Sequence, residues 1–131
     1  MMTVIGEYKH ILVEGQVVHT YPSADFDAIA IDQAFDQVEQ TAASLDSWIL
    51  YEHPDETAGF TSGAMGQLME RYRQLQSQGC IGVACHVDSI FGRILRQNLP
   101  AEFPLPVLID AQRQALDDFV VKLLHEHRQS S

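Results

Sequence analysis

The sequence contains little cysteine, and the position of its two thiols argues against a disulfide. Cys80 and Cys85 are the cysteines among 131 residues, and both fall in the apolar run 79–87, which predicts a buried strand. Successive side chains of a strand point to opposite faces, so these two residues should face opposite sides of a sheet, too far apart to be bridged. We therefore expect two reduced, structural cysteines that share no metal.

Long apolar runs and linker-like segments are also absent. The sequence has no stretch of about 18 apolar residues, and residues 1–7 lack the basic start and apolar core of a signal peptide. Hydrophobic residues make up 46% of the chain, and no Pro/Gly/Ser-rich tract divides it. These features predict one domain over residues 1–131, frayed at residues 128–131, in a cytoplasmic protein.

Basic residues are scarce in the first half of the chain. Residues 1–60 hold eleven acidic residues and one basic residue, Lys9, while residues 61–131 hold seven of each, so the formal charge is −10. An acidic field repels phosphate backbones and anionic lipid surfaces. We therefore expect no nucleic-acid or membrane binding. The acidic half either keeps the surface solvated or docks a basic partner.

Motifs of catalysis and of metal binding are missing. No glycine-rich phosphate loop follows a strand, and no Gly-x-Ser-x-Gly nucleophile turn occurs. His53, Asp55 and Glu56 share one predicted loop that could approach His86, but no Cys/His spacing defines a metal site. The sequence predicts no catalytic residues, no metal and no cofactor, and hence a protein that is not an enzyme.

What the sequence does contain is an alternation of strand and helix patterns. The predicted strands are 8–13, 16–20, 47–51, 79–87 and 107–109, and the predicted helices are 31 to about 44, 61–78, 90–95 and a final one through Leu116 and Leu124. The order β-β-α-β-α-β-α-β-α predicts an α/β fold with a mixed β-sheet, an opening antiparallel hairpin and about four helices. Asp88 or Ser89, and Asp110, are the expected N-caps of the last two helices.

The helical periodicity also assigns polar side chains to outer faces. Asp32, Asp36 and Glu39 lie between the apolar positions of the first helix, which predicts an acidic outer face. Arg71 is likewise assigned away from the apolar face of the helix 61–78.

Residues 61–75, TSGAMGQLMERYRQL, followed by residues 79–84, GCIGVA, resemble a known family. They are similar to the Ser-Ser-Gly-led helix and the next strand of the anti-sigma-factor antagonist (STAS, SpoIIAA-like) family. The likeness is greatest to small uncharacterised SpoIIAA-like proteins of proteobacteria, some of which are linked to CRAL-TRIO-type lipid-binding folds. The element order agrees along most of the chain, so the resemblance implies a SpoIIAA-like single domain.

The resemblance implies a non-enzymatic domain that docks a partner protein and is switched by phosphorylation. Ser62 matches the family's phosphorylated serine, and Thr61 matches the hydroxyl residue before it. The family's usual Asp is replaced by Phe60, and the preceding loop, 52–59, is longer and more polar than in the family. A hydroxyl at a helix start either caps backbone N–H groups or, once phosphorylated, faces the positive end of the helix dipole.

Two hypotheses about function follow. The first is a STAS-like regulatory domain whose partner surface comprises Thr61, Ser62 and Gly63, with the adjoining loop residues His53, Asp55 and Glu56. The alternative is a carrier or sensor of a small apolar or nucleotide ligand, held in a CRAL-TRIO-like pocket. Helical spacing otherwise places the candidate lining residues in the ordinary core; these are Met65, Met69, Tyr72 and Phe91. A homo-oligomer is compatible with both hypotheses.

Overall fold

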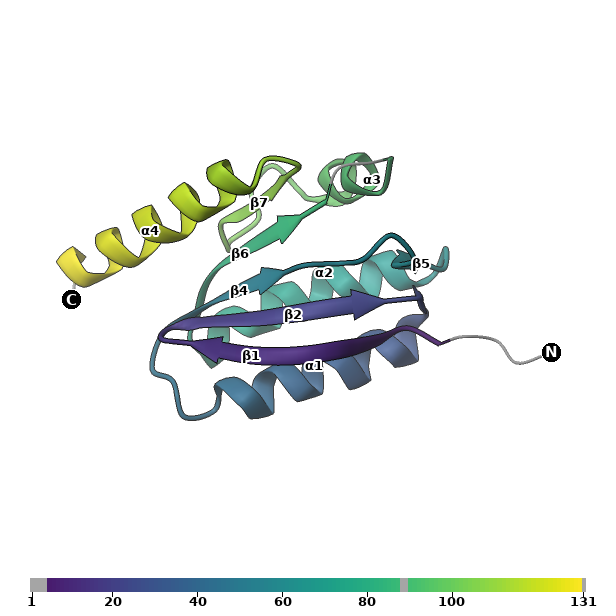
Figure 1. The fold of residues 1–131 in the computed structure, drawn as a ribbon, viewed down its shortest axis with the longest axis horizontal. Coiled ribbons are helices and arrows are strands. Elements are labelled where there is room, and N and C mark those ends of the chain that lie inside the picture. The colour runs from purple at the N-terminus through teal and green to yellow at the C-terminus, as the bar shows by residue number, and fades with distance from the viewer. Residues whose placement is uncertain (1–4, 88–89, 131) are drawn as a thin grey trace.

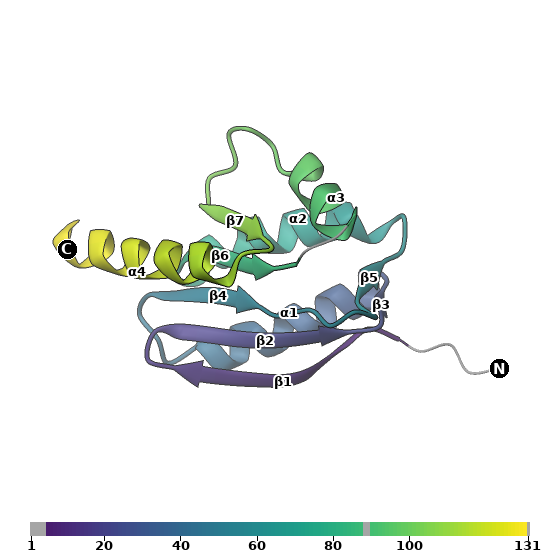
Figure 2. The same cartoon turned by 45° about the horizontal axis from the view of Figure 1, so that its top comes forward.

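The computed structural model describes residues 5–87 and 90–130 and shows a twisted sheet with helices on both faces (Figures 1 and 2). The strands are β1 Glu7–Glu14, β2 Val17–Ser23, β3 Asp25–Phe26, β4 Trp48–Glu52, β5 Gly59–Phe60, β6 Cys80–His86 and β7 Val107–Asp110. The helices are α1 Ala28–Ala42, α2 Ala64–Leu75, the 3-10 turn η1 Gln76–Gln78, α3 Ile90–Asn98 and α4 Arg113–Ser130.

The main sheet has the order β1-β2-β4-β6-β7, with β1 antiparallel to β2 and the other pairs parallel. The predicted mixed sheet and its opening hairpin are confirmed, and Gly15 makes the turn with a φ of 60°. The strands β3 and β5, which form a separate two-stranded ribbon, were not predicted. Each has two residues, too few for any alternation of side chains to be seen in the sequence.

Two apolar cores lie on opposite faces of the sheet. On the first face, α1 and α2 pack over the sheet around Val18, Leu50 and Val83. On the second face, α4 packs against Ile49 and Ala84 through its predicted apolar stripe. Figure 1 shows α4 beside β6 and β7, and on that face α4 also shares a core with Val17 at the start of β2. We call these two faces the α1/α2 face and the α4 face.

The prediction that Cys80 and Cys85 face opposite sides of the sheet is wrong. Both thiols are free and buried, and both belong to the core on the α1/α2 face. The reason is a β-bulge: Trp48 pairs with Cys80 and the next pair is Ile49 with Gly82, so Ile81 has no partner. The extra residue shifts the alternation by one and returns Cys85 to the side of Cys80.

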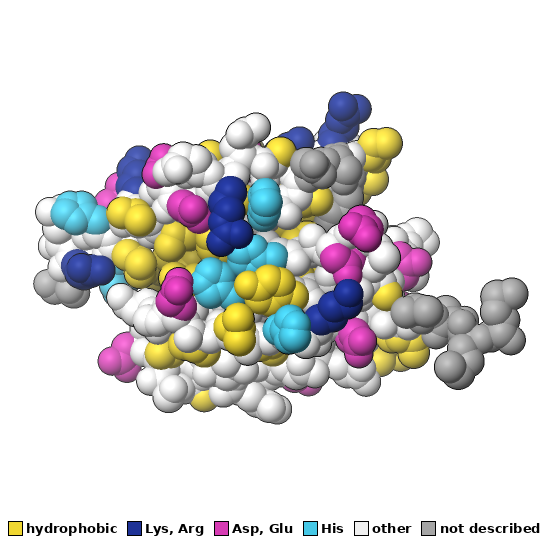
Figure 3. Space-filling view, in the orientation of Figure 1, with side chains coloured by type: hydrophobic (Ala, Val, Ile, Leu, Met, Phe, Trp, Pro, Cys, Tyr) yellow, Lys and Arg dark blue, Asp and Glu magenta, His cyan; other side chains and the backbone are white. Residues whose placement is uncertain are grey.

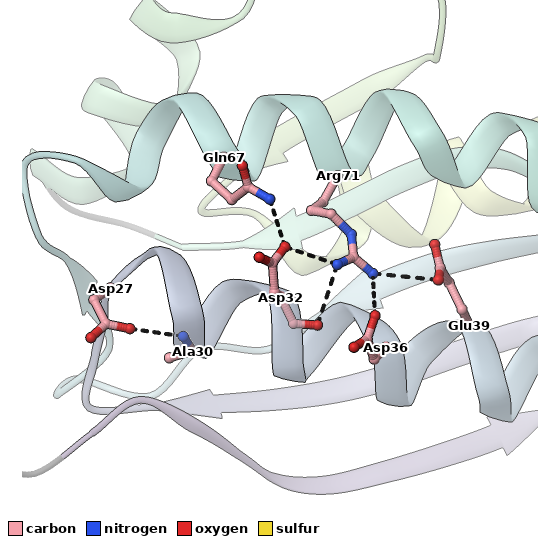
Figure 4. A network of polar contacts seen from close by, with 7 residues as sticks. All are labelled: Asp27, Ala30, Asp32, Asp36, Glu39, Gln67 and Arg71. Atoms are coloured by element: carbon pink, nitrogen blue, oxygen red, sulfur yellow. Dashed lines mark hydrogen bonds and ion pairs between the residues drawn. The ribbon is translucent and has the colours of Figure 1, made fainter.

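The predicted acidic outer face of α1 in fact meets a buried cation on α2. Arg71 is 7% exposed and forms ion pairs with Asp32 and Asp36, each at 2.9 Å, and with Glu39 at 3.4 Å (Figure 4). Gln67 also donates a hydrogen bond to Asp32. The sequence assigned Arg71 to an outer face because periodicity does not reveal that a neighbouring helix supplies three carboxylates.

Several predicted helix ends differ from the observed ones. The first helix begins at Ala28, after the N-cap Asp27 whose side chain accepts a hydrogen bond of 2.8 Å from the Ala30 N–H, and it ends at Ala42 instead of about residue 44. Asp110 ends β7 and accepts a hydrogen bond of 2.7 Å from the Gln112 N–H, just before α4. The last helix extends to Ser130, and the fraying expected at residues 128–131 stays a prediction. The proposed caps at positions 88 and 89 lie outside the described residues.

Candidate functional site

The turn Thr61-Ser62-Gly63, which we call the Thr61 turn, precedes α2 at the carboxyl edge of the parallel strands. Gly63 occupies the N-cap position, and no side chain caps the helix. The Ala64 N–H donates a hydrogen bond of 3.0 Å to the Thr61 carbonyl, and all three turn residues are exposed. The interpretation of the hydroxyls as plain helix caps is therefore wrong, because glycine occupies the capping position.

The loop before the Thr61 turn is held in place by Asp55. Its carboxylate accepts hydrogen bonds from the backbone N–H and the hydroxyl of Thr57, at 2.8 and 2.6 Å, and pairs with Lys9 at 3.1 Å. The Thr57 hydroxyl in turn accepts a hydrogen bond of 3.0 Å from the Ala24 N–H. The hydrogen bonds from Thr57 lower the pKa of Asp55 far below its usual range. Asp55 thus fastens the loop, while Glu56 is exposed.

The third residue predicted in this loop, His53, belongs to a cluster of rings on the α4 face. Its ring lies 4.4 Å from that of Tyr51, 4.8 Å from Tyr21 and 5.2 Å from His19, all roughly parallel. A hydrogen bond of 2.9 Å joins His19 Nδ1 and His53 Nε2. We call these four residues the ring cluster. Figure 3 shows histidine and hydrophobic side chains gathered at the centre of this face.

His53, the central residue of the ring cluster, is uncharged near pH 7. Burial, followed by the neighbouring His19 and Arg113, lowers the pKa of His53 to about 4. The Tyr51 hydroxyl donates a hydrogen bond of 2.9 Å to Asp117. Burial, followed by this contact, raises the pKa of Tyr51 to about 12. Tyr51 is buried beneath α4, whereas the rings of His19, Tyr21 and His53 are partly exposed on this face.

Between the sheet and the helices α1 and α2, near the carboxyl ends of β2, β4 and β6, lies a cavity of about 20 Å³. That volume accommodates about one water molecule. The cavity is partly open to solvent, and the ribbon β3–β5 contributes Phe26 and Phe60 to its wall. Of the residues that the sequence proposed for a pocket, Tyr72 lines it, Met65 and Met69 do not, and the side chain of Phe91 lies outside the described part of the chain.

The cavity contains a buried carboxylate, Glu52, at the end of the central strand β4. Glu52 is 6% exposed, and its Oε1 accepts a hydrogen bond from the Tyr72 hydroxyl. It sits in register between Thr20 of β2 and Cys85 of β6. Burial raises the pKa of Glu52 to about 7, although the Tyr72 hydrogen bond works in the opposite direction. We call this the Glu52 cavity.

Neither a protein-family model nor a curated protein sequence matches this chain. Among solved structures it is similar to an uncharacterised protein of the DUF3478 family from Shewanella loihica PV-4, which is described as having a SpoIIAA-like fold. The likeness has a TM-score of 0.56 at 10% identity and covers 88% of this chain and 93% of that one. This chain has a SpoIIAA-like fold. At that identity the likeness establishes the fold alone.

The SpoIIAA-like fold brings the sequence-predicted site residues to one edge of the sheet but divides them by role. The Thr61 turn is exposed, Asp55 is structural and His53 joins the ring cluster. Sequence reasoning missed Glu52, which it placed at the start of the loop. The available signal was an acidic residue directly after four apolar or aromatic strand residues, where a carboxyl end of a parallel sheet is expected.

Within residues 5–87 and 90–130, no three His, Cys, Asp or Glu side chains are grouped so as to hold a metal ion. His86 instead lies with its Nε2 3.1 Å from the Ala111 carbonyl oxygen. None of the helices in the same ranges combines the length and hydrophobicity needed to cross a bilayer.

Proposed function

We propose that this SpoIIAA-like protein is a non-enzymatic, cytoplasmic regulatory domain that binds a partner protein at the Thr61 turn and is controlled by phosphorylation of Ser62. The observation that carries the proposal is the uncapped N-terminus of α2, where two exposed hydroxyl residues precede Gly63. A phosphate added to Ser62 would meet the free backbone N–H groups and the positive end of the helix dipole without displacing an existing side-chain cap.

The surroundings of the turn support a docking role. The loop that leads to it is fixed by Asp55, so the turn is presented by a rigid neighbour and little ordering entropy is lost on binding. The exposed side chains of Asp25 and Glu56 at the same edge add negative charge. A partner that is basic where it meets Asp25 and Glu56, but offers no positive charge where it covers Ser62, fits this edge, so that a phosphate on Ser62 would be desolvated without a counter-charge.

The test compares partner capture and partner affinity for wild type and Ser62→Asp. A pull-down from host lysate identifies the partner, and titration calorimetry with that purified partner then gives the affinity. An acidic side chain desolvated inside a docking surface should weaken binding by about 1–3 kcal/mol. The same charge near the helix N-terminus should leave stability within about 1 kcal/mol, which matched thermal melts check.

Gln74→Asp is the matched control, because it adds the same charge at an exposed position near the other end of α2. The proposal expects Gln74→Asp to bind the partner as wild type does. Equal affinity of all three proteins for the captured partner would show that the Thr61 turn is not the docking surface.

A carrier of a nucleotide or lipid is the second candidate, and the size of the Glu52 cavity disfavours it. A volume of about 20 Å³ holds one water molecule, whereas ligand pockets for drug-sized molecules span roughly 300–1,000 Å³. Native mass spectrometry of the purified protein separates the candidates, since a retained nucleotide or lipid would add its mass to that of the bare chain.

A further inference from the structure

The described residues that line the Glu52 cavity are mostly apolar, and their polar groups are the Glu52 carboxylate, the hydroxyls of Tyr8 and Tyr72 and the Cys85 thiol. The Glu52 carboxylate has one hydrogen-bond donor among the described residues, the Tyr72 hydroxyl. The hydroxyl of Thr20, its neighbour in register, is completely buried and makes no hydrogen bond of normal geometry. A buried carboxylate with one donor lacks most of the hydrogen bonds that it would make in water. Among the described residues, Glu52 therefore receives one hydrogen bond, and none of the residues that line the cavity carries a positive charge.

The titratable neighbours of Glu52 do not supply that charge. Burial raises the pKa values of Tyr8, Tyr72 and Cys85 well above their usual values, so all three are neutral near pH 7. The Arg71 guanidinium lies over the ring of Phe35, 5.7 Å from its centre, and pairs there with three carboxylates of α1. Within the part of the chain that the structure describes, no cationic side chain lines the cavity to pair with ionised Glu52.

The remaining wall of the cavity is rich in aromatic rings. The lining includes Tyr8, Phe26, Phe35, Phe60 and Tyr72. Their rings form contacting pairs, with centres 6.2 Å apart for Tyr8 and Phe26, 6.3 Å for Phe26 and Phe60, and 5.6 Å for Phe35 and Tyr72. The faces of aromatic rings attract cations, and a carboxylate among such rings favours a cation further.

We propose that the Glu52 cavity binds the ammonium group of a small organic amine, with the Glu52 carboxylate as its counter-ion. An ammonium group is about the size of a water molecule, which matches the cavity volume of about 20 Å³. It donates up to three hydrogen bonds and carries the missing charge. The carbon chain would leave through the partly open side, past the half-buried Pro54, Ala58 and Phe60.

Other ligand classes fit this cavity less well. An anion would be repelled by Glu52 and by a protein of formal charge −10. A purely apolar molecule would displace water and leave the carboxylate without further partners, which is costly. An amine satisfies both the carboxylate and the ring faces, and this site is independent of the docking role proposed for the Thr61 turn.

The test uses two probes of equal shape, n-butylamine and 1-butanol, titrated into the full chain at pH 8 and followed by calorimetry and by NMR shifts of the Phe26 and Phe60 rings. The proposal expects saturable amine binding that moves these ring signals. It expects butanol to bind at least about tenfold more weakly, as the loss of a charge-assisted contact implies. Absence of saturable amine binding, or equal affinity for the two probes, would overturn the proposal.

Two variants test the role of the carboxylate. Glu52→Gln keeps the size of the side chain and should weaken amine binding by at least about tenfold. Glu56→Gln removes the same charge from an exposed position in the adjoining loop and should leave the affinity unchanged within about twofold. Undiminished amine binding by a folded Glu52→Gln protein would overturn the assignment. Circular dichroism checks that Glu52→Gln is folded. If it does not fold, the comparison of n-butylamine with 1-butanol on the wild-type protein tests the proposal by itself.

Discussion

At the residue scale, Glu52 combines burial with an acidic side chain, and its ionisation opposes folding. Its folded-state pKa of about 7 lies above the ordinary value of 4.5. The folded chain therefore binds more protons than the unfolded chain between these values, and stability falls as the pH rises through that window. The loss is complete above about pH 7.

We predict that Glu52→Gln removes this pH dependence. Urea unfolding at pH 5 and pH 8 should show wild type losing about 2–3 kcal/mol more than the variant between the two conditions, since each pKa unit corresponds to about 1.4 kcal/mol. Glu56→Gln, which alters an exposed carboxylate, should behave as wild type. Parallel pH profiles for wild type and Glu52→Gln would contradict the elevated pKa.

His53 should produce the opposite effect on the acidic side. Its folded-state pKa of about 4 lies below the ordinary 6.5, so the folded chain binds fewer protons and stability falls as the pH drops from 6.5 towards 4. The groups around its ring are His19, Arg113, His86 and Asp117. Since the ring is only partly buried, we expect His53→Phe to reduce the stability lost between pH 7 and pH 4.5 by about 1–2 kcal/mol. Chemical unfolding at the two pH values measures this, and an unchanged loss would mean that other groups are responsible.

At the scale of elements, Arg71 fastens α1 to α2 through one buried guanidinium. Its carboxylate partners are partly exposed, so they remain hydrated when the cation is removed and do not become buried, unpaired charges. We predict that Arg71→Ala destabilises the fold by about 2–3 kcal/mol, through lost packing of the side-chain stem and lost ion pairs.

Arg71→Met separates these two contributions, because methionine restores most of the volume but none of the charge. It should recover about half of the loss seen in Arg71→Ala. Asp36→Asn, which removes one 61% exposed partner, should cost less than about 1 kcal/mol in the same urea titration. A larger effect for Asp36→Asn than for Arg71→Ala would rule out the guanidinium as the centre of the network.

The elements that the sequence predicted correctly are those with long, regular patterns. The apolar positions Ile31, Phe35 and Val38 repeat at helical spacing and are all buried, and the run 48–51 is the central strand. The bulge at Ile81 could not be read from the sequence, since one unpaired residue in an apolar run leaves the pattern apolar. The Glu52 cavity was equally invisible because β1, β4 and α2 build it from residues distant in sequence. The Thr61 turn was located by resemblance, and its role stays a prediction.

At the scale of the whole molecule, one sheet lies between the two cores and contributes side chains to both of them. Leu50 faces the first core while Ile49, its neighbour in the chain, faces the second, so neither core can be lost without disturbing β4. We predict a single cooperative unfolding transition for the unliganded protein. The fluorescence of the fully buried Trp48 and the far-ultraviolet circular dichroism should change at the same urea concentration. Two separated transitions would show that α4 and its core unfold independently.

The uneven cover of the sheet also implies an uneven exchange of backbone amide hydrogens with solvent. All five residues of β4 are buried between helices, whereas most of β1 is exposed at the edge of the sheet. Amides of β4 should therefore exchange only when the whole molecule unfolds, and those of β1 should exchange through local opening of the edge. Deuterium uptake measured residue by residue should rank β4 slowest and β1 fastest among the long strands. Tyr8, which lines the Glu52 cavity, lies on β1. Local opening of this edge strand would therefore also open one wall of the cavity.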